Sequence, residues 1–174
     1  MSDSREAVLV IDMLYGFMAE ESTLYCGEDA QQIIPTVEAL LKAKNKAARI
    51  FVCDSHSKDD PEFEMFPPHC LEGTREAKII DQLKPYADIV VKKTTIDAFY
   101  HTDLEKVLAE HRPDKVFVVG VCTDICVLYA VAGLRLRGYQ VVVPRDCVAS
   151  FHKGAHQWAL SHIERVLGAS VERF

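Results

Sequence analysis

Short apolar segments alternate with segments of helical period along the chain, and this alternation is the strongest constraint on its fold. Six segments of strand-like composition lie at residues 7–12, 49–54, 88–93, 115–120, 139–144 and 169–174. Most are apolar almost throughout, as expected for strands buried on both faces of a parallel sheet. Between them, apolar side chains recur about every 3.6 residues, at 29–47, 102–111, 123–138 and 153–168. The pattern predicts an α/β fold: a three-layer, doubly wound sandwich around a six-stranded, mainly parallel sheet.

Residues typical of helix ends support the expected bounds of the helices. Thr102 and Glu105 have the spacing of a capping box, and Gly138 and Gly168 stand where two helices should end. Pro35 interrupts the first helical segment, so it must occupy a first turn or cause a kink. We therefore expect separate helices that cover both faces of the sheet.

The composition is that of one soluble globular domain. Hydrophobic residues make up 49% of the 174 residues and charged residues 26%, and the formal net charge is −6. A negative chain without a basic patch is a poor nucleic-acid binder. No apolar run approaches the ~18 residues of a membrane span, and the amino terminus lacks the apolar core of a signal peptide. We expect a single cytoplasmic domain over residues 1–174, with no nucleic-acid or membrane partner.

The six cysteines are expected to be reduced thiols, because nothing in the sequence indicates secretion. Cys122 and Cys126 are one residue further apart than the cysteines of a CxxC redox motif. Their spacing leaves four interpretations open: a redox pair, half of a metal site, a catalytic thiol beside a bystander, or two small core residues.

Polar side chains stand at the ends of the first four expected strands. In chain order they are Asp12, Asp54, Lys93 and the pair Cys122 and Cys126. The carboxyl ends of parallel strands share one edge of a sheet, where ligands bind in doubly wound folds. Asp12 alone could cap a helix and Lys93 alone could point into water, so their combination is what indicates a site.

Cys126 is expected in the first turn of a helix, after Thr123 or Asp124 as the capping residue. The unpaired N–H groups of such a turn stabilise a thiolate, and a nearby ammonium lowers the pKa of the thiol further. A nearby aspartate raises that pKa but can accept the proton. Asp12, Lys93 and Cys126 therefore form a candidate nucleophilic triad.

A long irregular loop after the second strand carries another set of polar side chains, within residues 55–78. Asp54 and His56 face the same side of an extended segment, so both can bind one cation. His69 can return as a third ligand, and the candidates for a fourth are Glu62 and Glu64. Imidazole and carboxylate ligands suit Zn²⁺, Fe²⁺ or Mn²⁺ better than Ca²⁺ or Mg²⁺. On spacing alone, however, two histidines in a polar loop are more often solvated than bound to a metal.

Several longer motifs resemble the nicotinamidases of the isochorismatase-like cysteine hydrolase superfamily. The matching segments cover nearly the whole chain: VLVIDMLYGF, DSH followed by PE, FPPH and GT, KKTTIDAFYHTDL, GVCTDICVLYAVAG and VASFHKGAHQWALSHIERVLGA. The most specific are GVCTDICV and FPPH with the upstream DSH. The resemblance implies that the α/β sandwich has the isochorismatase-like hydrolase fold, with a metal-binding loop at about 54–75.

The resemblance also implies a role for each candidate residue. Cys126 matches the nucleophile of the family, Asp12 its proton acceptor and Lys93 the third member of the triad. The backbone N–H groups of Cys122 and Cys126 match the oxyanion hole, beside a cis peptide bond between Val121 and Cys122. The matching metal ligands are Asp54, His56, Glu62 and His69, and the aromatic residues expected to flank the substrate ring are Phe17 and Phe66.

The implied reaction is hydrolysis of nicotinamide to nicotinate and ammonia through a thioester on Cys126, a step of NAD salvage. The implied cofactor is one divalent transition metal, Zn²⁺ first with Fe²⁺ or Mn²⁺ as alternatives, and the implied assembly is a homo-oligomer. The segment AFYHTDL departs from the family pattern, because Tyr100 and His101 add bulk near the expected pocket mouth.

Two alternatives stay open beside this interpretation. The first is an amidohydrolase of the same superfamily that acts on another small amide or a carbamoyl compound. The second is a non-catalytic metal-binding or redox-responsive protein, which would form a reversible disulfide between Cys122 and Cys126. An isochorismatase proper is less favoured, because cleavage of a vinyl ether does not call for the histidines of DSH and FPPH.

Overall fold

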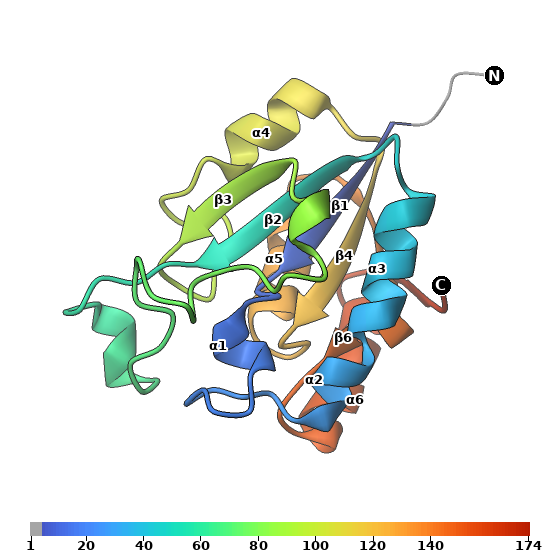
Figure 1. The fold of residues 1–174 in the computed structure, drawn as a ribbon. Helices are drawn as coiled ribbons and strands as arrows, with labels where there is room; N and C mark the ends of the chain where they lie inside the picture. Colours follow the sequence, from blue (N-terminus) through green and yellow to red (C-terminus); the bar gives the residue numbers. More distant parts are fainter. Residues whose placement is uncertain (1–4) are drawn as a thin grey trace.

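The six expected strands form one parallel sheet in the computed structural model, which describes residues 5–174 (Figure 1). They lie in the order β3-β2-β1-β4-β5-β7. Their bounds are Glu6–Ile11 for β1, Ala48–Asp54 for β2, Ile89–Lys93 for β3, Lys115–Val121 for β4, Gln140–Pro144 for β5 and Ser170–Glu172 for β7. A short strand that the sequence did not indicate, β6 (Val148–Ala149), pairs with the end of β4. The predicted fold class is confirmed, with seven strands in the sheet rather than six.

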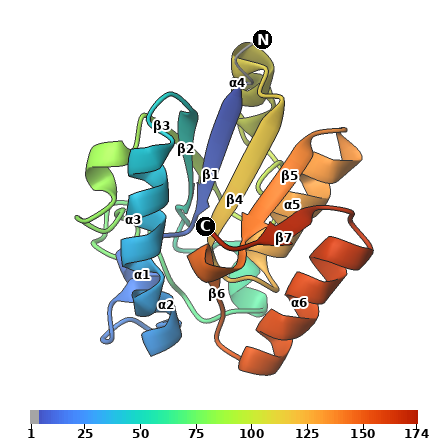
Figure 2. The ribbon, with the colours of Figure 1, turned by 90° about the vertical axis from the view of Figure 1, so that its right-hand side faces the viewer.

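Helices cover both faces of the sheet and give the three layers (Figure 2). One face packs against α1 (Tyr15–Met18), α2 (Glu28–Gln32) and α3 (Ile34–Ala43). The other packs against α4 (Leu104–His111), α5 (Cys126–Leu136) and α6 (Lys153–Arg165). Short 3-10 helices lie in the connections, at η1 (Pro61–Glu64), η2 (Lys84–Tyr86) and η3 (Arg145–Cys147). Within residues 5–174, the structure has no helix with the length and apolar character of a membrane span.

The first helical segment is divided where the sequence places its proline. It splits into α2 and α3 at Ile33, and Pro35 lies in the first turn of α3, where a missing N–H costs no helical hydrogen bond. Two other helices end near the predicted glycines. Gly138 and Gly168 have φ angles of 84° and 66°, the left-handed conformation that glycine adopts without steric cost.

The predicted capping box at the start of α4 is only half formed: Oγ1 of Thr102 accepts a hydrogen bond of 3.3 Å from the N–H of Leu104. The helix begins one residue later than expected, after Asp103, which makes no side-chain capping hydrogen bond. The same hydroxyl of Thr102 donates to the carbonyl oxygen of Ala98 at 2.6 Å. Glu105 lies on the surface and pairs with Arg137 at 3.3 Å. The threonine part of the capping pattern is therefore kept, and a tertiary ion pair has replaced the glutamate part.

The strand order reverses between β1 and β4, which lie side by side at the centre of the sheet. The chain moves outward from β1 through β2 to β3, and then crosses back to β4 and moves outward on the other side. A reversal of this kind opens a crevice at the carboxyl ends of the strands. Gly120 permits the close approach of the two strands, because a Cβ there would collide with the carbonyl oxygen of Ile11.

Candidate active site

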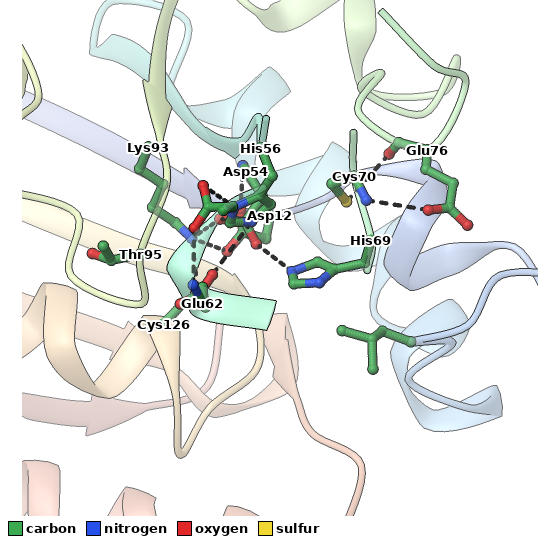
Figure 3. Close-up of polar contacts among 12 residues, drawn as sticks. Asp12, Asp54, His56, Glu62, His69, Cys70, Glu76, Lys93, Thr95 and Cys126 are labelled. Atoms are coloured by element: carbon green, nitrogen blue, oxygen red, sulfur yellow. Dashed lines mark hydrogen bonds and ion pairs between the residues drawn. The ribbon is translucent and has the colours of Figure 1, made fainter. Parts of the chain in front are cut away.

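The crevice at the strand reversal gathers the predicted triad (Figure 3). Asp12 follows β1 with a φ of 50°, Lys93 is the last residue of β3, and Cys126 is the first residue of α5. Lys93 stands opposite Asp54, the last residue of β2, in the parallel pairing of their strands. Side chains from four strand ends or the loops after them therefore meet at one point of the sheet edge.

Lys93 lies at the centre of this group. Its Nζ is 2.9 Å from Asp12 Oδ2 and 3.5 Å from Cys126 Sγ, and it donates a hydrogen bond to Asp54 Oδ1. The other oxygen of Asp12 accepts a hydrogen bond of 2.9 Å from the backbone N–H of Asp54. All four residues are buried. An ammonium so deep in the protein is held there by the two carboxylates that pair with it.

The charges in this group shift its pKa values in opposite directions. Burial and the charge of Asp54 raise the pKa of Asp12 to about 6, against the opposing effect of Lys93. Burial disfavours the ammonium, but the charges of Asp12 and Asp54 outweigh it and hold the pKa of Lys93 well above its usual value. Burial raises the pKa of the Cys126 thiol, and Lys93 opposes this only in part. The thiol therefore needs a proton acceptor to react, and the neighbouring Asp12 is suited to that task.

The four predicted metal ligands form a cluster beside the triad. Asp54, His56, Glu62 and His69 are all buried, and one ligand atom of each lies within 4.8 Å of the others. Nε2 of His56 is 3.3 Å from Glu62 Oε2 and 3.6 Å from Asp54 Oδ1. Nε2 of His69 is 3.4 Å from Asp54 Oδ2. Glu64, the other candidate for the fourth ligand, is exposed and does not belong to the cluster.

The atoms of this cluster fit a divalent transition metal. Within the described chain, His56 Nε2 and Glu62 Oε1 are buried without a hydrogen-bond partner. A buried polar atom left unpaired costs about 1–3 kcal/mol, so a cation bound to both would relieve that cost. Two imidazoles and two carboxylates are ligands that Zn²⁺, Fe²⁺ and Mn²⁺ accept.

Asp60 is a residue of this site that sequence reasoning missed. It is buried, and its Oδ1 accepts a hydrogen bond of 3.0 Å from the backbone N–H of Glu62. Its other oxygen lies 3.1 Å from Nδ1 of His56. A carboxylate behind a metal-binding histidine orients the imidazole ring. The signal that could have separated Asp60 from the exposed Asp59 is its place directly before Pro61, because an aspartate before a first-turn proline is typical of a helix N-cap, and Asp60 caps η1.

The loop from β4 to α5 places the nucleophile candidate. The peptide bond between Val121 and Cys122 is cis, as the resemblance implies. Cys126 lies in the first turn of α5, as predicted. The residue before the helix is Ile125, which offers no capping side chain, and the N–H of Val127 in the first turn donates to the carbonyl oxygen of Cys122 at 3.1 Å.

The prediction that Thr123 or Asp124 caps this helix is wrong. Thr123 is fully buried, and its Oγ1 lies 2.8 Å from Nδ1 of His156 on α6. Asp124 accepts a hydrogen bond from the hydroxyl of Ser150 after β6. Both side chains therefore attach the loop to the rest of the protein rather than ending the helix.

A pocket joins the triad and the cluster of metal-type ligands. Its apolar lining comes from Phe17, Leu24, Phe66, Ile96, Ile125 and Phe151. Phe17 and Phe66, the two predicted aromatic residues, stand edge-on to the ring of His69, with centroids 5.7 and 6.3 Å away. The sequence missed Leu24, Ile96 and Phe151 because they lie outside the periodic apolar segments, and it missed Ile125 because apolar residues of a helical segment are expected in the core.

Tyr100 and His101 are placed differently from expectation. Their rings pack on each other with centroids 4.1 Å apart, and Tyr100 is exposed. Neither residue is among those that line the pocket. The pocket itself therefore gives these two residues no direct part in binding.

Comparison with known proteins places the chain in a family. The model of the isochorismatase domain matches residues 6–172. A curated relative from Bacillus subtilis, an uncharacterized isochorismatase family protein called PncA, is 34% identical over 96% of this chain and 98% of its own length. The family match thus covers both the triad and the cluster of metal-type ligands.

Solved structures of similar proteins share the fold over nearly the whole chain. The nicotinamidase PncA of Bacillus subtilis has a TM-score of 0.91 and 37% identity, and the match covers 97% of this chain and 99% of that one. An N-carbamoylsarcosine amidase from Thermoplasma acidophilum has a TM-score of 0.87 and 28% identity, with 97% and 96% covered. The pyrazinamidase of Pyrococcus horikoshii, solved in complex with zinc, has a TM-score of 0.89 and 25% identity, with 98% and 99% covered.

The names of these similar proteins support amidohydrolase activity. The match of the domain model and the 34% identity to the Bacillus subtilis relative show that the chain belongs to the isochorismatase family.

Proposed function

We propose that the protein is a metal-dependent cysteine amidohydrolase that converts nicotinamide to nicotinate and ammonia. The observation that carries the proposal is the contact of Lys93 Nζ with both Asp12 and Cys126, beside a cluster of metal-type ligands. A thiol, a proton acceptor and an aromatic pocket next to a cation site match a small aromatic amide that has a ring nitrogen.

In the proposed reaction, Asp12 takes the proton of the Cys126 thiol, and the sulfur attacks the carboxamide carbon. Lys93 is 2.9 Å from the carboxylate and 3.5 Å from the sulfur, so it favours the anionic form of both. Asp12 then returns the proton to the departing ammonia. The acyl group stays on Cys126 as a thioester, and a water molecule deprotonated by Asp12 hydrolyses it.

The tetrahedral intermediate needs donors for its negatively charged oxygen. We assign this role to the backbone N–H groups of Cys122 and Cys126, which stand at the cis peptide bond and at the start of α5. Loss of one such donor costs about 3 kcal/mol in other acyl-transfer enzymes. Phe17 and Phe66 would hold the substrate ring in the pocket.

The loop at about 54–75 is our candidate for the metal-binding loop. Asp54, His56, Glu62 and His69 would hold one divalent metal, with Zn²⁺ as the first candidate and Fe²⁺ or Mn²⁺ as alternatives. The ion, when bound, supplies a Lewis acid that the ring nitrogen of the substrate can coordinate.

Ammonia release tests the proposed function. Purified full-length protein is incubated with nicotinamide after treatment with EDTA and after addition of Zn²⁺, Mn²⁺ or Fe²⁺. We expect hydrolysis with at least one metal, and a loss of about 10-fold or more in rate after chelation that the same metal restores. Absence of ammonia with all three metals, from protein with a cooperative thermal transition, would contradict the assignment.

A second candidate is the hydrolysis of another small amide or of a carbamoyl compound, which the similarity in fold to an N-carbamoylsarcosine amidase favours. The same assay with pyrazinamide and N-carbamoylsarcosine ranks the substrates by kcat/KM. We expect nicotinamide or pyrazinamide to rank first, because Phe17 and Phe66 line the pocket and aromatic side chains pack favourably against an aromatic ring. A higher kcat/KM for the carbamoyl compound would support the second candidate.

Several expectations from the sequence stay predictions. They are a single domain over residues 1–174, a cytoplasmic location, a place in NAD salvage and a homo-oligomeric assembly.

Asp60 is expected to strengthen metal binding without touching the metal. Its Oδ2 is 3.1 Å from Nδ1 of His56, close enough to orient the imidazole ring. Its Oδ1 accepts a hydrogen bond from the backbone N–H of Glu62 and so fixes the position of that residue. We expect Asp60→Ala to weaken Zn²⁺ affinity about 10- to 100-fold, and Asp60→Asn to weaken it less, because the amide oxygen still accepts from Glu62.

Competition with a chromophoric zinc chelator measures this affinity directly. Asp59→Asn is the matched control, because it removes the same charge from an exposed neighbour. Equal zinc affinities for the Asp60→Ala and Asp59→Asn variants would show that Asp60 does not position the ligands.

A further inference from the structure

Two buried thiols from distant parts of the chain touch beside the pocket. Sγ of Cys26 lies 3.3 Å from Sγ of Cys122, although the two residues are 96 positions apart. The exposed fraction is 3% for Cys26 and 4% for Cys122. A disulfide bond is about 2.05 Å long, so its formation requires the sulfurs to approach by little more than ~1 Å. A redox pair of Cys122 with Cys126 is one of four interpretations left open by the sequence, whereas the structure brings Cys26 against Cys122.

The two cysteines come from different segments around the site: the segment after α1 and the loop after β4. Cys26 follows α1, and its backbone N–H donates a hydrogen bond of 2.9 Å to the carbonyl oxygen of Phe17, a residue that lines the pocket. Cys122 lines the pocket itself and follows the cis peptide bond after β4. A covalent link between them would fix the segment after α1 to the loop that carries the nucleophile candidate.

We propose that Cys26 and Cys122 form a site of reversible oxidative modification, at which a small peroxide converts the two thiols to a disulfide. The pocket is the route of access, because Cys122 lines it and Cys26 stands behind Cys122. Hydrogen peroxide is small and uncharged, so it can reach a sulfur that a larger disulfide reagent cannot.

The reaction balances in two steps. The Cys122 sulfur attacks one oxygen of hydrogen peroxide, the O–O bond breaks, and a sulfenic acid and one water form. The Cys26 sulfur then attacks the sulfur of that sulfenic acid, the S–O bond breaks, and the disulfide and a second water form. The two thiols lose two electrons and two protons in total, and the peroxide is reduced to two waters.

The pair is expected to react slowly and to stay reduced at rest. Contact with Cys26 and burial hold the pKa of Cys122 well above its usual value, which makes the reactive thiolate scarce. The rate of oxidation should therefore rise with pH. Cys126 would react with the same reagent, so a test of the pair must exclude it.

Mass spectrometry of the Cys126→Ala protein tests the site without interference from the nucleophile candidate. The folded full-length chain is treated with hydrogen peroxide, and free thiols are then blocked with N-ethylmaleimide in denaturant. We expect two fewer maleimide adducts per chain and a peptide that links Cys26 to Cys122, both reversed by a phosphine reductant. The thermal midpoint should rise by several degrees on oxidation, because the link closes a long loop of the unfolded chain.

Two further variants in the same background control the result. Adding Cys26→Ala should abolish the linked peptide, whereas adding Cys147→Ala, which removes another buried thiol, should leave it unchanged. Oxidation of Cys122 to a sulfinic acid without a link, a link to another cysteine, or no oxidation at any peroxide concentration that leaves the protein folded would overturn the proposal.

The effect on activity, unlike the disulfide itself, rests on the proposed function. Closing the bond would move Cys122, whose N–H is the proposed oxyanion donor, so the linked form should lose at least about 10-fold in activity. In wild-type protein, the linked fraction and the reductant-reversible loss of ammonia release should rise together, and the Cys26→Ala protein, in which only Cys126 oxidation can act, should lose less activity at the same peroxide dose. A linked form that is fully active would contradict this effect alone, and a protein inactive on nicotinamide before oxidation would contradict the proposed function alone.

Discussion

Replacing Cys126 with alanine is expected to lower amide hydrolysis by about 10⁴-fold or more, whereas Cys122→Ala should cost no more than about 10-fold. The two thiols are four residues apart, but Lys93 Nζ is 3.5 Å from the sulfur of Cys126, and the sulfur of Cys122 contacts Cys26. The first substitution removes the attacking atom. The second keeps the backbone N–H that is proposed to hold the oxyanion.

Steady-state kinetics of ammonia release measures both effects, with metal content and thermal midpoint determined for each variant. Cys122→Ala is the matched control, because it removes a buried thiol from the same loop. If both variants, folded and metal-loaded, lost the same fraction of the rate of ammonia release, Cys126 could not be the nucleophile with Cys122 acting only through its backbone N–H. A nearly normal rate for Cys126→Ala would rule out covalent catalysis at this residue.

The sequence predicts the site well where strands end. Asp12, Asp54 and Lys93 each stand at the carboxyl end of an apolar strand segment. Parallel strands bring these ends to one edge of the sheet, independently of the conformation of the loops. Cys126 follows the same logic, because it begins the helix after β4. The parallel sheet brings these residues together, and the pattern of apolar residues in the sequence is enough to predict that sheet.

The loop residues could not be predicted in the same way. Glu62 and Glu64 are two positions apart in a segment without period, and only the fold of η1 buries the first and exposes the second. Asp60 acts through its position behind His56, which no local pattern reveals. The contact between Cys26 and Cys122 joins segments 96 residues apart, so spacing within either segment carries no information about it.

The buried ammonium of Lys93 is expected to make the largest contribution to stability of any charge in the site. It pairs with Asp12 and Asp54, and both carboxylates are buried with it. Lys93→Met keeps the length and much of the volume of the side chain but leaves two uncompensated carboxylates side by side. Removing one partner of a buried ion pair costs about 3–5 kcal/mol, so we expect a loss of this size in the free energy of unfolding.

Urea unfolding of metal-free protein measures this loss, and Lys92→Met is the matched control. Lys92 is the preceding residue of β3, and its ion pair with Glu72 is exposed, so its removal should change the free energy of unfolding by less than about 1 kcal/mol. The loss in Lys93→Met should also shrink as the pH falls from 8 toward 5. Burial and Asp54 raise the pKa of Asp12 to about 6 even against Lys93, so without the ammonium the folded Asp12 binds its proton at a higher pH than the unfolded one, and the variant gains stability on acidification. Equal stabilities of the two variants at pH 8 would show that the carboxylates do not depend on Lys93.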